Sequence, residues 1–473
     1  MSQQKFDKFV NKNPHHHLTF FNRPHWTRRQ FFQIAGAGVT GSYLANRAIA
    51  AETTSQPSVV TQNKAQNVIF ILLTGAISHT DTFDLKVVNG VTPSNFSPTI
   101  VNGTAWPTGL LPKLGQQLPN MAIVRSVHAW ALVHSLSQRW TQIGRNPAAA
   151  LGDIAPNIGS VVAIEKDKNR RVGQVFPTFI SLNSPSGANG GYFPAAYSPF
   201  HVNEAVTSSG FGLPNTTNPL SPTSPTRLDD MYSRLHQLDD PLRVNSPLGQ
   251  PVTDFDGFYS AAKGLTYNGV VKQAFAFNAA DSARYGATPF GNSCLVAKQV
   301  LQADQGTRFV QLSFGSWDFH MDIYGQQNPK GQNMYTMGKQ LDDGVSALLA
   351  DLKASGLLDQ TLVVMAAEFG RTVGPLTAAG GRDHWPQQSI IFAGAGVKGG
   401  KVIGSTTADG SDMLDPGWSR QRYIRPEDVE ATIYSAVGID WTTVRRDDPF
   451  GRGFEYVPFS SQNLYGPIDE LWQ

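Results

Sequence analysis

The stretch Gly356-Leu-Leu-Asp-Gln-Thr-Leu-Val-Val-Met-Ala-Ala-Glu-Phe-Gly-Arg-Thr372 contains an apolar run of strand length that ends directly at charged side chains. Such an unbroken run is typical of a strand covered on both faces, as in parallel sheets. Glu368 and Arg371 stand where this strand ends. Ligands of open α/β sheets bind outside the carboxyl ends of the strands. The stretch therefore indicates both a fold class and the position of a site.

Similar apolar runs and helical patterns alternate along the rest of the chain. The other runs cover residues 67–74, 121–124, 177–182, 308–314 and 389–392. Apolar residues at helical spacing predict helices over 290–303, 334–352 and 426–437. Gly356 stands as a C-terminal cap, and Pro426 opens the last helix. The alternation implies right-handed crossovers. We predict a three-layer α/β/α sandwich with a mostly parallel central sheet.

Bulk composition excludes several classes of protein. The chain has 473 residues and a net charge of +2, but residues 1–50 hold seven Lys/Arg and one Asp. This leaves about −4 for residues 51–473, without a basic stripe, so we expect no nucleic-acid partner. The single cysteine, Cys294, permits no intrachain disulfide and lies in an apolar helical pattern typical of a core residue.

The N-terminus has the features of an export signal. Thr27-Arg28-Arg29-Gln30-Phe31-Phe32 precedes a mild apolar run at 34–45 and the small residues Ala48-Ile49-Ala50. This order favours a twin-arginine signal over 1–50, rather than a short buried helix that begins with two arginines. The run is shorter than the roughly 20 apolar residues of a membrane span, and no later segment qualifies. We expect the twin-arginine translocase as a partner and a periplasmic or extracellular protein.

The predicted domain organisation is simple. Residues 51–66 are polar and form the predicted linker, and 67–473 form a single hydrolase-like domain. Residues 183–227 are rich in Ser, Pro, Asn, Gly and Thr, which predicts a long irregular excursion.

Metal-ligating side chains gather near the predicted strand ends. The candidate ligands are Asp81 and Asp84 after strand 67–74, Asp318 and His320 after strand 308–314, Glu368, and His384 before strand 389–392. Other histidines near strand ends are His79, His128 and His134. Mixed carboxylate and imidazole ligands suit a divalent transition metal, with Zn²⁺ or Mn²⁺ favoured as one or two ions. A metal pair would clamp the oxygens of an in-line displacement.

Each candidate has a structural alternative. The turn at Asp318 and His320 is one that its own hydrogen bonds can hold, and His384 is placed to cap a loop. Glu368 and Arg371 are spaced for a structural ion pair. Arg371 and Arg382 are candidate catalytic residues that hold an anionic oxygen bidentately, or else they fix loops. Aspartates such as Asp81 and Asp84 are common in turns.

Several motifs together resemble a known family. They are Ser78–Lys86, Gly315–His320, Gly356–Val364, Glu368–Thr372 and Gly381–Trp385, with His134 ahead of Gly144-Arg145. In this order, over roughly 67–440, they resemble the exported proteins grouped as domain-of-unknown-function 1501. That family looks like a branch of the alkaline phosphatase and sulfatase superfamily. The resemblance implies an alkaline-phosphatase-like fold and a ligand order of Asp81 or Asp84, Asp318, His320, Glu368 and His384.

The resemblance leaves the nucleophile open. The superfamily's attacking Ser or Thr has no clear counterpart, and Ser78, Thr80 and Ser135 remain candidates. Thr74-Gly75-Ala76 stands where Gly-Gly-Pro is usual. Our leading hypothesis is an exported metal-dependent hydrolase of phosphate or sulfate esters, acting on a small anionic ester or a polysaccharide. The alternative is a non-catalytic binding protein with the same fold. Ligand atoms that share one metal should converge within about 5 Å.

Overall fold

The computed structural model describes residues 59–184, 189–202, 225–243, 264–265, 268–325 and 331–473. The described residues from Val60 to Gln473 form one compact unit. The predicted signal at 1–50, residues 51–58 of the predicted linker, and much of the predicted excursion at 183–227 lie outside the described residues.

The centre of the fold is an eight-stranded sheet. Across the sheet the strands are β12 (Lys401–Ile403), β4 (Met121–His128), β11 (Gln387–Ala393), β8 (Thr361–Ala367), β1 (Asn67–Leu73), β7 (Phe309–Ser313), β5 (Phe179–Leu182) and β6 (Phe200–Val202). Only β11 runs antiparallel to its neighbours, and the other pairs are parallel. The six predicted strands and the mostly parallel sheet are confirmed.

Further elements surround this sheet. The short antiparallel pairs are β2 (Pro98–Val101) with β3 (Thr104–Pro107), β9 (Gly370–Arg371) with β10 (His384–Trp385), β13 (Ser405–Thr406) with β14 (Met413–Asp415), and β15 (Val444–Arg445) with β16 (Phe454–Glu455). The α-helices are α3 (Pro112–Gly115), α4 (His134–Ile143), α5 (Ile158–Lys166), α6 (Pro225–Arg243), α8 (Gly269–Phe275), α9 (Ala279–Arg284), α10 (Pro289–Gln302), α11 (Met334–Ala354) and α12 (Pro426–Ala436).

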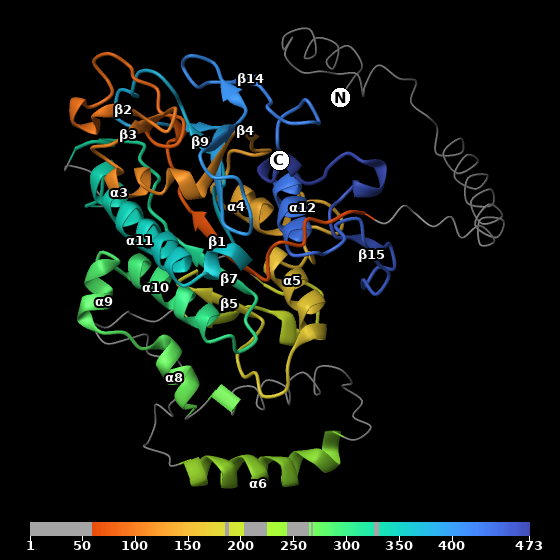
Figure 1. Cartoon of the computed structure of the whole chain (residues 1–473). Coiled ribbons are helices and arrows are strands. Elements are labelled where there is room, and N and C mark those ends of the chain that lie inside the picture. Colours follow the sequence, from red (N-terminus) through yellow and green to blue (C-terminus); the bar gives the residue numbers. More distant parts are fainter. Residues whose placement is uncertain (1–58, 185–188, 203–224, 244–263, 266–267, 326–330) are drawn as a thin grey trace, which may run out of the picture. The chain divides into compact units, whose positions relative to one another are not determined.

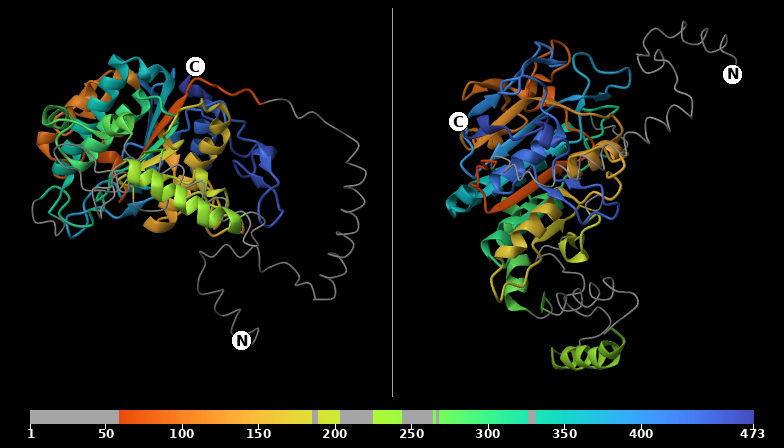
Figure 2. Two further views of the ribbon diagram at one scale, coloured as in Figure 1. Left: turned by 90° about the horizontal axis from the view of Figure 1, so that it is seen from below. Right: turned by 90° about the vertical axis from the view of Figure 1, so that its right-hand side faces the viewer.

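Helices cover both faces of the sheet. In Figures 1 and 2, α3, α10 and α11 lie on one side of the strands, and α4, α5 and α12 lie on the other. The predicted three-layer α/β/α arrangement is therefore confirmed. The helices predicted at 290–303, 334–352 and 426–437 correspond to α10, α11 and α12 within two residues at each end.

Local sequence explains these layers. Every residue of β1 is buried, and Ile69 and Ile71 share one core with Leu341 and Val345 of α11. Each such side chain contributes roughly 1.5–3 kcal/mol on burial. On the other face, α5 approaches closely because it presents Gly159. A β-carbon there would lie 2.5 Å from the ring of Phe309.

The carboxyl ends of β8, β1 and β7 meet at one edge of the sheet. These strands are parallel neighbours, and Leu73 is in register with Ala367. The loop after β1 turns at Gly75, whose φ is +92° and whose β-carbon would lie 2.7 Å from the backbone nitrogen of Asp318. Only glycine fits both constraints. Loops from three strands therefore converge at this edge.

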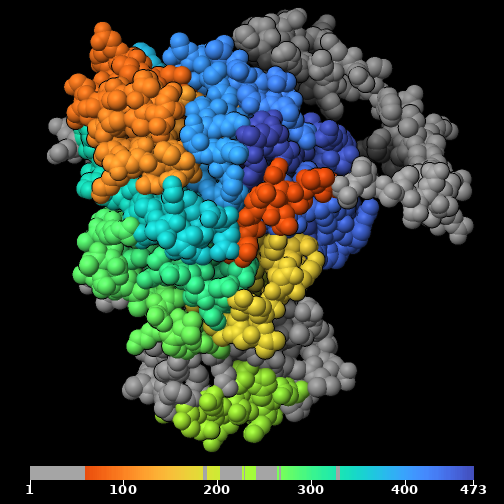
Figure 3. All heavy atoms as spheres, in the orientation of Figure 1, coloured from red at the N-terminus to blue at the C-terminus, as the bar shows by residue number. Residues whose placement is uncertain are grey.

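The first described residues lie against the C-terminal part of the chain, as the red and blue segments of Figure 3 show. The backbone N–H groups of Asn63 and Ala65 donate to the carbonyls of Ser435 and Ala436 at the end of α12. Among the described residues, no helix combines the length and apolar character needed to cross a membrane.

Candidate metal centre

Four side chains reach the sheet edge from different elements. Asp318 and His320 lie in the loop after β7, where they alternate with the buried Trp317 and Phe319. Burial of the two aromatic rings leaves Asp318 and His320 partly open to solvent, at 29% and 42% of side-chain area. His384 begins β10, which pairs with β9 just beyond β8, and His134 is the first residue of α4.

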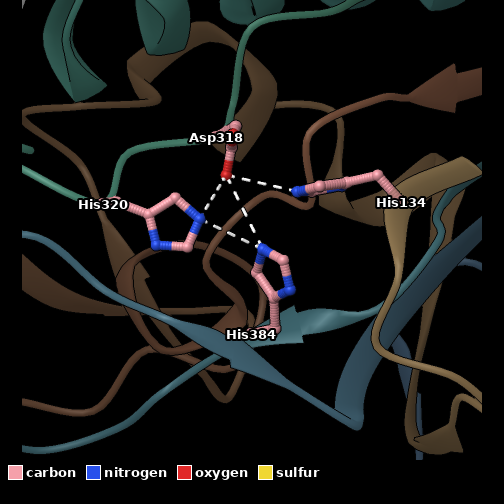
Figure 4. A group of neighbouring side chains, drawn as sticks. All are labelled: His134, Asp318, His320 and His384. Atoms are coloured by element: carbon pink, nitrogen blue, oxygen red, sulfur yellow. Dashed lines mark hydrogen bonds and ion pairs between the residues drawn. The ribbon is translucent and has the colours of Figure 1, made fainter.

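One ligand atom from each of these four residues, His134, Asp318, His320 and His384, lies within 4.8 Å of the others. We call this group the His–Asp cluster (Figure 4). Asp318 Oδ1 is 2.9 Å from Nε2 of His320, 3.2 Å from Nε2 of His134 and 3.8 Å from Nε2 of His384. The Nε2 atoms of His320 and His384 are 3.1 Å apart.

Each imidazole of the cluster has an oxygen atom at its other nitrogen. Nδ1 of His134 lies 2.7 Å from Glu368 Oε1, and Nδ1 of His320 lies 2.8 Å from Asp383 Oδ1. Nδ1 of His384 lies 2.7 Å from the carbonyl oxygen of Leu132. These partners assign the proton of each neutral ring to Nδ1, so the Nε2 lone pairs face Asp318. Acceptors that converge in this way favour a positive charge between them, which a metal ion or a proton on one of the rings supplies.

The spacing fits a single metal ion. Bonds of about 2.0–2.2 Å place the atoms of a tetrahedral ligand set about 3.4 Å apart. Four of the six separations in the cluster run from 2.9 to 3.8 Å and bracket that value, and all six lie within 4.8 Å. Three imidazoles and one carboxylate suit Zn²⁺, Mn²⁺ or Fe better than Mg²⁺ or Ca²⁺. Within the described residues no second group of three such side chains comes together.

Arg371 determines the charge state of Asp318. Its Nη2 donates to Asp318 Oδ1 at 2.6 Å. Partial burial by itself raises the pKa of Asp318, but the hydrogen bond and charge of Arg371, followed by the charges of His320 and His134, outweigh it. The pKa of Asp318 therefore lies well below its usual range, and the carboxylate is ionised at neutral pH.

Two histidines of the cluster differ in basicity. The hydrogen bond with Glu368 raises the pKa of His134. Burial lowers the pKa of His384, and the charges of Arg371 and the other two histidines lower it further. At neutral pH His384 is a neutral imidazole, whereas His134 retains a proton more readily. A metal that binds here therefore has to displace a proton chiefly at His134.

Glu368 lies behind His134 and outside the four-residue group. Its carboxylate is fully buried, and Oε1 accepts hydrogen bonds from the backbone N–H of Gly75 at 2.8 Å and from Nε2 of Gln138 at 3.0 Å, besides contacting His134. These contacts orient His134. None of these contacts makes Glu368 a direct metal ligand or a base, and that role stays a prediction.

Asp81 and Asp84 are not brought to the cluster. Asp81 is fully buried, and its two oxygens accept hydrogen bonds from Arg382 and from the hydroxyl of Tyr324. Asp84 is equally buried and lies 3.1 Å from Arg125 Nε and 3.2 Å from Lys86 Nζ. The ligand roles expected for Asp81 and Asp84 stay predictions, and neither residue belongs to the His–Asp cluster.

The two candidate catalytic arginines are engaged within the protein. Arg371 donates to the carbonyls of Gly75, Ala76 and Arg382 in addition to Asp318. Arg382 donates to Asp81 and to two loop carbonyls. Each is only 1% exposed. Arg371 acts on the cluster through Asp318, and anion binding by either arginine stays a prediction.

The remaining predicted histidines and hydroxyls lie elsewhere. Nε2 of His79 bonds the carbonyl of Gly410, and Nδ1 of His128 bonds the carbonyl of Ala129. The hydroxyls of Ser78 and Thr80 are buried, and Ser135 is exposed in the first turn of α4. Among the described residues, no serine or threonine hydroxyl bonds to the imidazole rings of the cluster.

The sequence gives only weak signals for His134 and for the oxygen partners of the three cluster histidines. His134 follows strand 121–124, but His79 and His128 also follow predicted strands, so this position does not single it out. Asp383 adjoins His384, yet nothing in the sequence linked it to His320. The carbonyl of Leu132 has no sequence signature at all.

Comparison with known proteins places the chain in a family. The profile described as "Protein of unknown function (DUF1501)" matches residues 65–463. No curated protein is a significant match. Similar solved structures include a sulfatase from Pseudoalteromonas sp., with 11% identity, coverage of 80% of this chain and 68% of that one, and a TM-score of 0.38. A phosphonate monoester hydrolase from Silicibacter pomeroyi has 13% identity, coverage of 79% and 74%, and a TM-score of 0.38.

A third similar structure is described as a protein in the alkaline phosphatase superfamily from Vibrio parahaemolyticus, with 12% identity, coverage of 83% and 74%, and a TM-score of 0.34. The family match spans nearly the whole described unit and agrees with the motifs noted in the sequence. The chain belongs to the DUF1501 family.

Proposed function

We propose that the protein is an exported metal-dependent hydrolase of phosphate or sulfate esters. One observation carries the proposal: three imidazoles and an ionised carboxylate converge at the carboxyl edge of a parallel sheet, and each imidazole has an oxygen partner on its far side. This is the arrangement of a metal site with an ordered outer shell. The family motifs support the choice of ester.

Each residue of the site has a distinct task. The His–Asp cluster holds the ion, and Arg371 keeps Asp318 ionised. Glu368 and Asp383 fix the rings of His134 and His320. When bound, a divalent cation supplies Lewis-acid chemistry, which acidifies water and withdraws charge from an ester oxygen. His320, the most exposed ligand, lies on the side from which substrate would enter.

We propose water as the attacking group. The support is that none of the described serine or threonine hydroxyls bonds to the cluster rings, while Ser78 and Thr80 are buried. Intact-mass measurement during turnover tests this. A phosphorylated or sulfated protein adduct that forms and decays at the rate of turnover would exclude water as the first nucleophile.

Metal content and turnover test the function itself. The purified mature chain should bind close to one equivalent of Zn, Mn or Fe and hydrolyse aryl phosphates or sulfates. His384→Ala and Asp318→Ala should lose both properties. The matched control is His201→Ala, which removes an exposed histidine outside the cluster. Stoichiometric metal in wild type and both cluster variants alike, or none in wild type, would refute the metal site.

A non-catalytic binding role is the second candidate. It is favoured by the internal engagement of Arg371 and Arg382, which leaves no arginine of the predicted pair to hold an anionic ester. A metal-loaded protein that turns over no aryl phosphate or sulfate, yet binds glycans, would favour this role. Turnover that disappears in His384→Ala would exclude it.

Export through the twin-arginine route is also a proposal. Its support is the ordered motif of paired arginines, apolar run and Ala-x-Ala at residues 27–50. Residues 1–50 fused to a reporter that is active only outside the cytoplasm should give signal. The Arg28→Lys, Arg29→Lys double variant should abolish it. Equal reporter signal from both fusions would reject this route.

A further inference from the structure

A pocket of about 440 Å³ lies between α4, α12 and the C-terminal segment. Four of its lining residues are aromatic: Trp130, Trp140, Phe459 and Tyr465. Trp130 and Phe459 are 44% and 49% exposed, which is unusual for such large apolar side chains. The volume falls in the range of about 300–1,000 Å³ that small-molecule sites occupy. None of the tasks assigned to the His–Asp cluster accounts for this pocket.

The two tryptophans of the pocket are fixed by one carboxylate. Glu427, in the first turn of α12, accepts a hydrogen bond from Nε1 of Trp130 at 3.0 Å and from Nε1 of Trp140 at 2.9 Å. The ring centroids are 6.1 Å apart with 23° between planes. Both indole N–H groups are already bonded, and Arg425 covers one face of Trp130. Trp130 nevertheless keeps 44% of its area exposed, so apolar ring surface remains open to a ligand. The result is a rigid aromatic platform.

The charges around this platform disfavour a cationic ligand. Arg425 lies 3.8 Å from the ring centroid of Trp130, and Arg145 and Arg452 line the pocket. Two carboxylates also line the pocket, but Glu427 is engaged by the two indoles, and Glu455 accepts hydrogen bonds from the backbone N–H of Phe459 and the hydroxyl of Ser461. An aromatic platform beside three guanidinium groups is suited to a neutral or anionic ligand rather than an ammonium group.

The pocket has one buried and one exposed arginine in its lining. Arg145 is 6% exposed, and its Nη2 donates to the carbonyls of Glu455 and Tyr456. Its guanidinium is stacked on the ring of Phe454, 3.9 Å from the centroid, so Arg145 forms part of the pocket wall. Arg452 lines the same pocket and is exposed, so its guanidinium can donate to a ligand. A sugar ring supplies both an apolar C–H face for the indoles and oxygen acceptors for that guanidinium.

The pocket and the His–Asp cluster share one segment of chain. Trp130 precedes Leu132, whose carbonyl bonds His384, and His134, the first ligand. The four residue steps from Trp130 to His134 span at most about 14 Å. A ring on the platform is therefore within reach of the cluster through a short saccharide.

We propose that this pocket is a saccharide subsite and that the substrate is a glycan carrying the phosphate or sulfate ester. The second half rests on the proposed hydrolase function, whereas the subsite itself does not. Ring stacking on Trp130 and Trp140 holds the glycan, and the exposed Arg452 faces its oxygens. The ester group then lies toward the cluster.

Binding of glycans tests the subsite without any need for turnover. The probes are a sulfated galactan oligosaccharide, the same oligosaccharide after desulfation, and tetramethylammonium as a cation, each titrated against the mature chain by calorimetry. We expect both oligosaccharides to bind, because the platform contacts the ring. We expect no binding of tetramethylammonium. Loss of all binding on desulfation, or preference for the cation, would overturn the subsite.

Matched variants locate the binding. Trp130→Ala should weaken oligosaccharide affinity at least tenfold, and Trp130→Phe should weaken it less. Val172→Ala changes an exposed apolar residue outside the pocket lining and should leave the affinity unchanged. Phe459→Ala replaces Trp130→Ala if the latter fails to fold by circular dichroism. Equal affinity in wild type and both pocket variants would overturn the proposal.

The same variants separate the subsite from the hydrolase. The preference for glycan is measured as kcat/KM on a sulfated glycan divided by kcat/KM on an aryl sulfate. This preference should be at least tenfold higher in wild type than in Trp130→Ala. If glycans bind on the platform but no ester is hydrolysed, the hydrolase proposal fails and the subsite stands. If aryl esters are hydrolysed but no glycan binds, the subsite fails and the hydrolase stands.

Discussion

Asp318 and Asp81 have similar positions in the sequence but opposite environments in the fold. Both lie in loops that follow neighbouring parallel strands, and each bonds an arginine that is 1% exposed. Asp318 keeps 29% of its side-chain area open and faces three imidazoles, whereas both oxygens of the fully buried Asp81 are bonded by Arg382 and Tyr324. The proposed ligand aspartate is therefore the one whose carboxylate stays partly open and faces the Nε2 lone pairs of other side chains, whereas Asp81 forms a structural ion pair with both oxygens bonded.

The largest expected effect is a loss of stability when Asp81 is removed from its buried ion pair with Arg382. Asp81→Ala leaves the guanidinium of Arg382 buried without its carboxylate. Loss of one partner from a buried ion pair costs about 3–5 kcal/mol. We expect a decrease of that size in the free energy of unfolding, measured in urea by circular dichroism. Asp318→Ala should lose less, because Arg371 keeps hydrogen bonds to three backbone carbonyls and the carboxylate it loses is partly open to solvent.

A double variant sharpens this test. Asp81→Leu with Arg382→Met replaces the pair by apolar side chains and should recover much of the lost stability, because no charge remains buried. If Asp81→Ala and Asp318→Ala destabilise the protein equally, the distinction between a structural and a ligand aspartate is wrong.

The second effect concerns the outer shell of the cluster. Glu368→Gln keeps the shape of the side chain but removes the charge that bonds His134. Loss of such a partner typically weakens metal affinity 10–100-fold, or about 1.4–2.7 kcal/mol. Competition with a chelating dye measures it. Asp383→Asn is the matched control, with a smaller expected loss because Asp383 is 61% exposed. Unchanged affinity in Glu368→Gln would remove Glu368 from the site.

Sequence patterns predicted the sheet well because a strand buried on both faces is an unbroken apolar run in the sequence. The runs at 67–74, 308–314 and 361–367 became β1, β7 and β8 almost residue for residue. Parallel pairing brings their carboxyl ends to one edge, and Asp318, His320 and His384 lie there as expected, near Glu368. Their roles as metal ligands stay predictions.

The rest of the site depends on loop conformation, which leaves little trace in a sequence. The sequence does not distinguish Asp81 and Asp84 from Asp318 as candidate ligands. The difference appears only in the fold, where Arg382 forms an ion pair with Asp81. His134 enters the cluster only because α4 begins at that residue, and α4 was not predicted. The antiparallel β11 likewise had the same apolar pattern as its parallel neighbours.

The carboxyl group of Glu430 tests how burial changes a pKa when no arginine bonds both carboxylate oxygens. Burial raises the pKa of Glu430 to about 8, from an ordinary value of 4.5, although the charge of Arg145 and a hydrogen bond from Tyr434 oppose the shift. In the pH window between these values the folded state binds more protons than the unfolded state. Stability therefore falls as pH rises through the window, by at most about 1.4 kcal/mol per pH unit.

Glu430→Gln should flatten this decline. Urea unfolding at pH 6 and pH 7 measures it, and Glu427, whose pKa burial raises to about 7, contributes a residual slope that remains in the variant. An unchanged slope would mean that Glu430 is not the group that titrates. Arg145 would then hold it ionised, much as Arg382 is bonded to Asp81.

The smallest effect is expected where an ion pair lies on the surface. Arg171 and Asp304 approach to 2.6 Å, but their side chains are 64% and 46% exposed. Water screens such a pair, and it contributes about 0–1 kcal/mol. Arg171→Gln should therefore lower the unfolding free energy by no more than this, and the difference should vanish in 1 M salt, where the screening length is about 3 Å. The loss in Asp81→Ala should persist in the same salt, because the pair of Asp81 and Arg382 is sealed from solvent. Equal salt dependence of the two variants would show that burial does not separate these pairs.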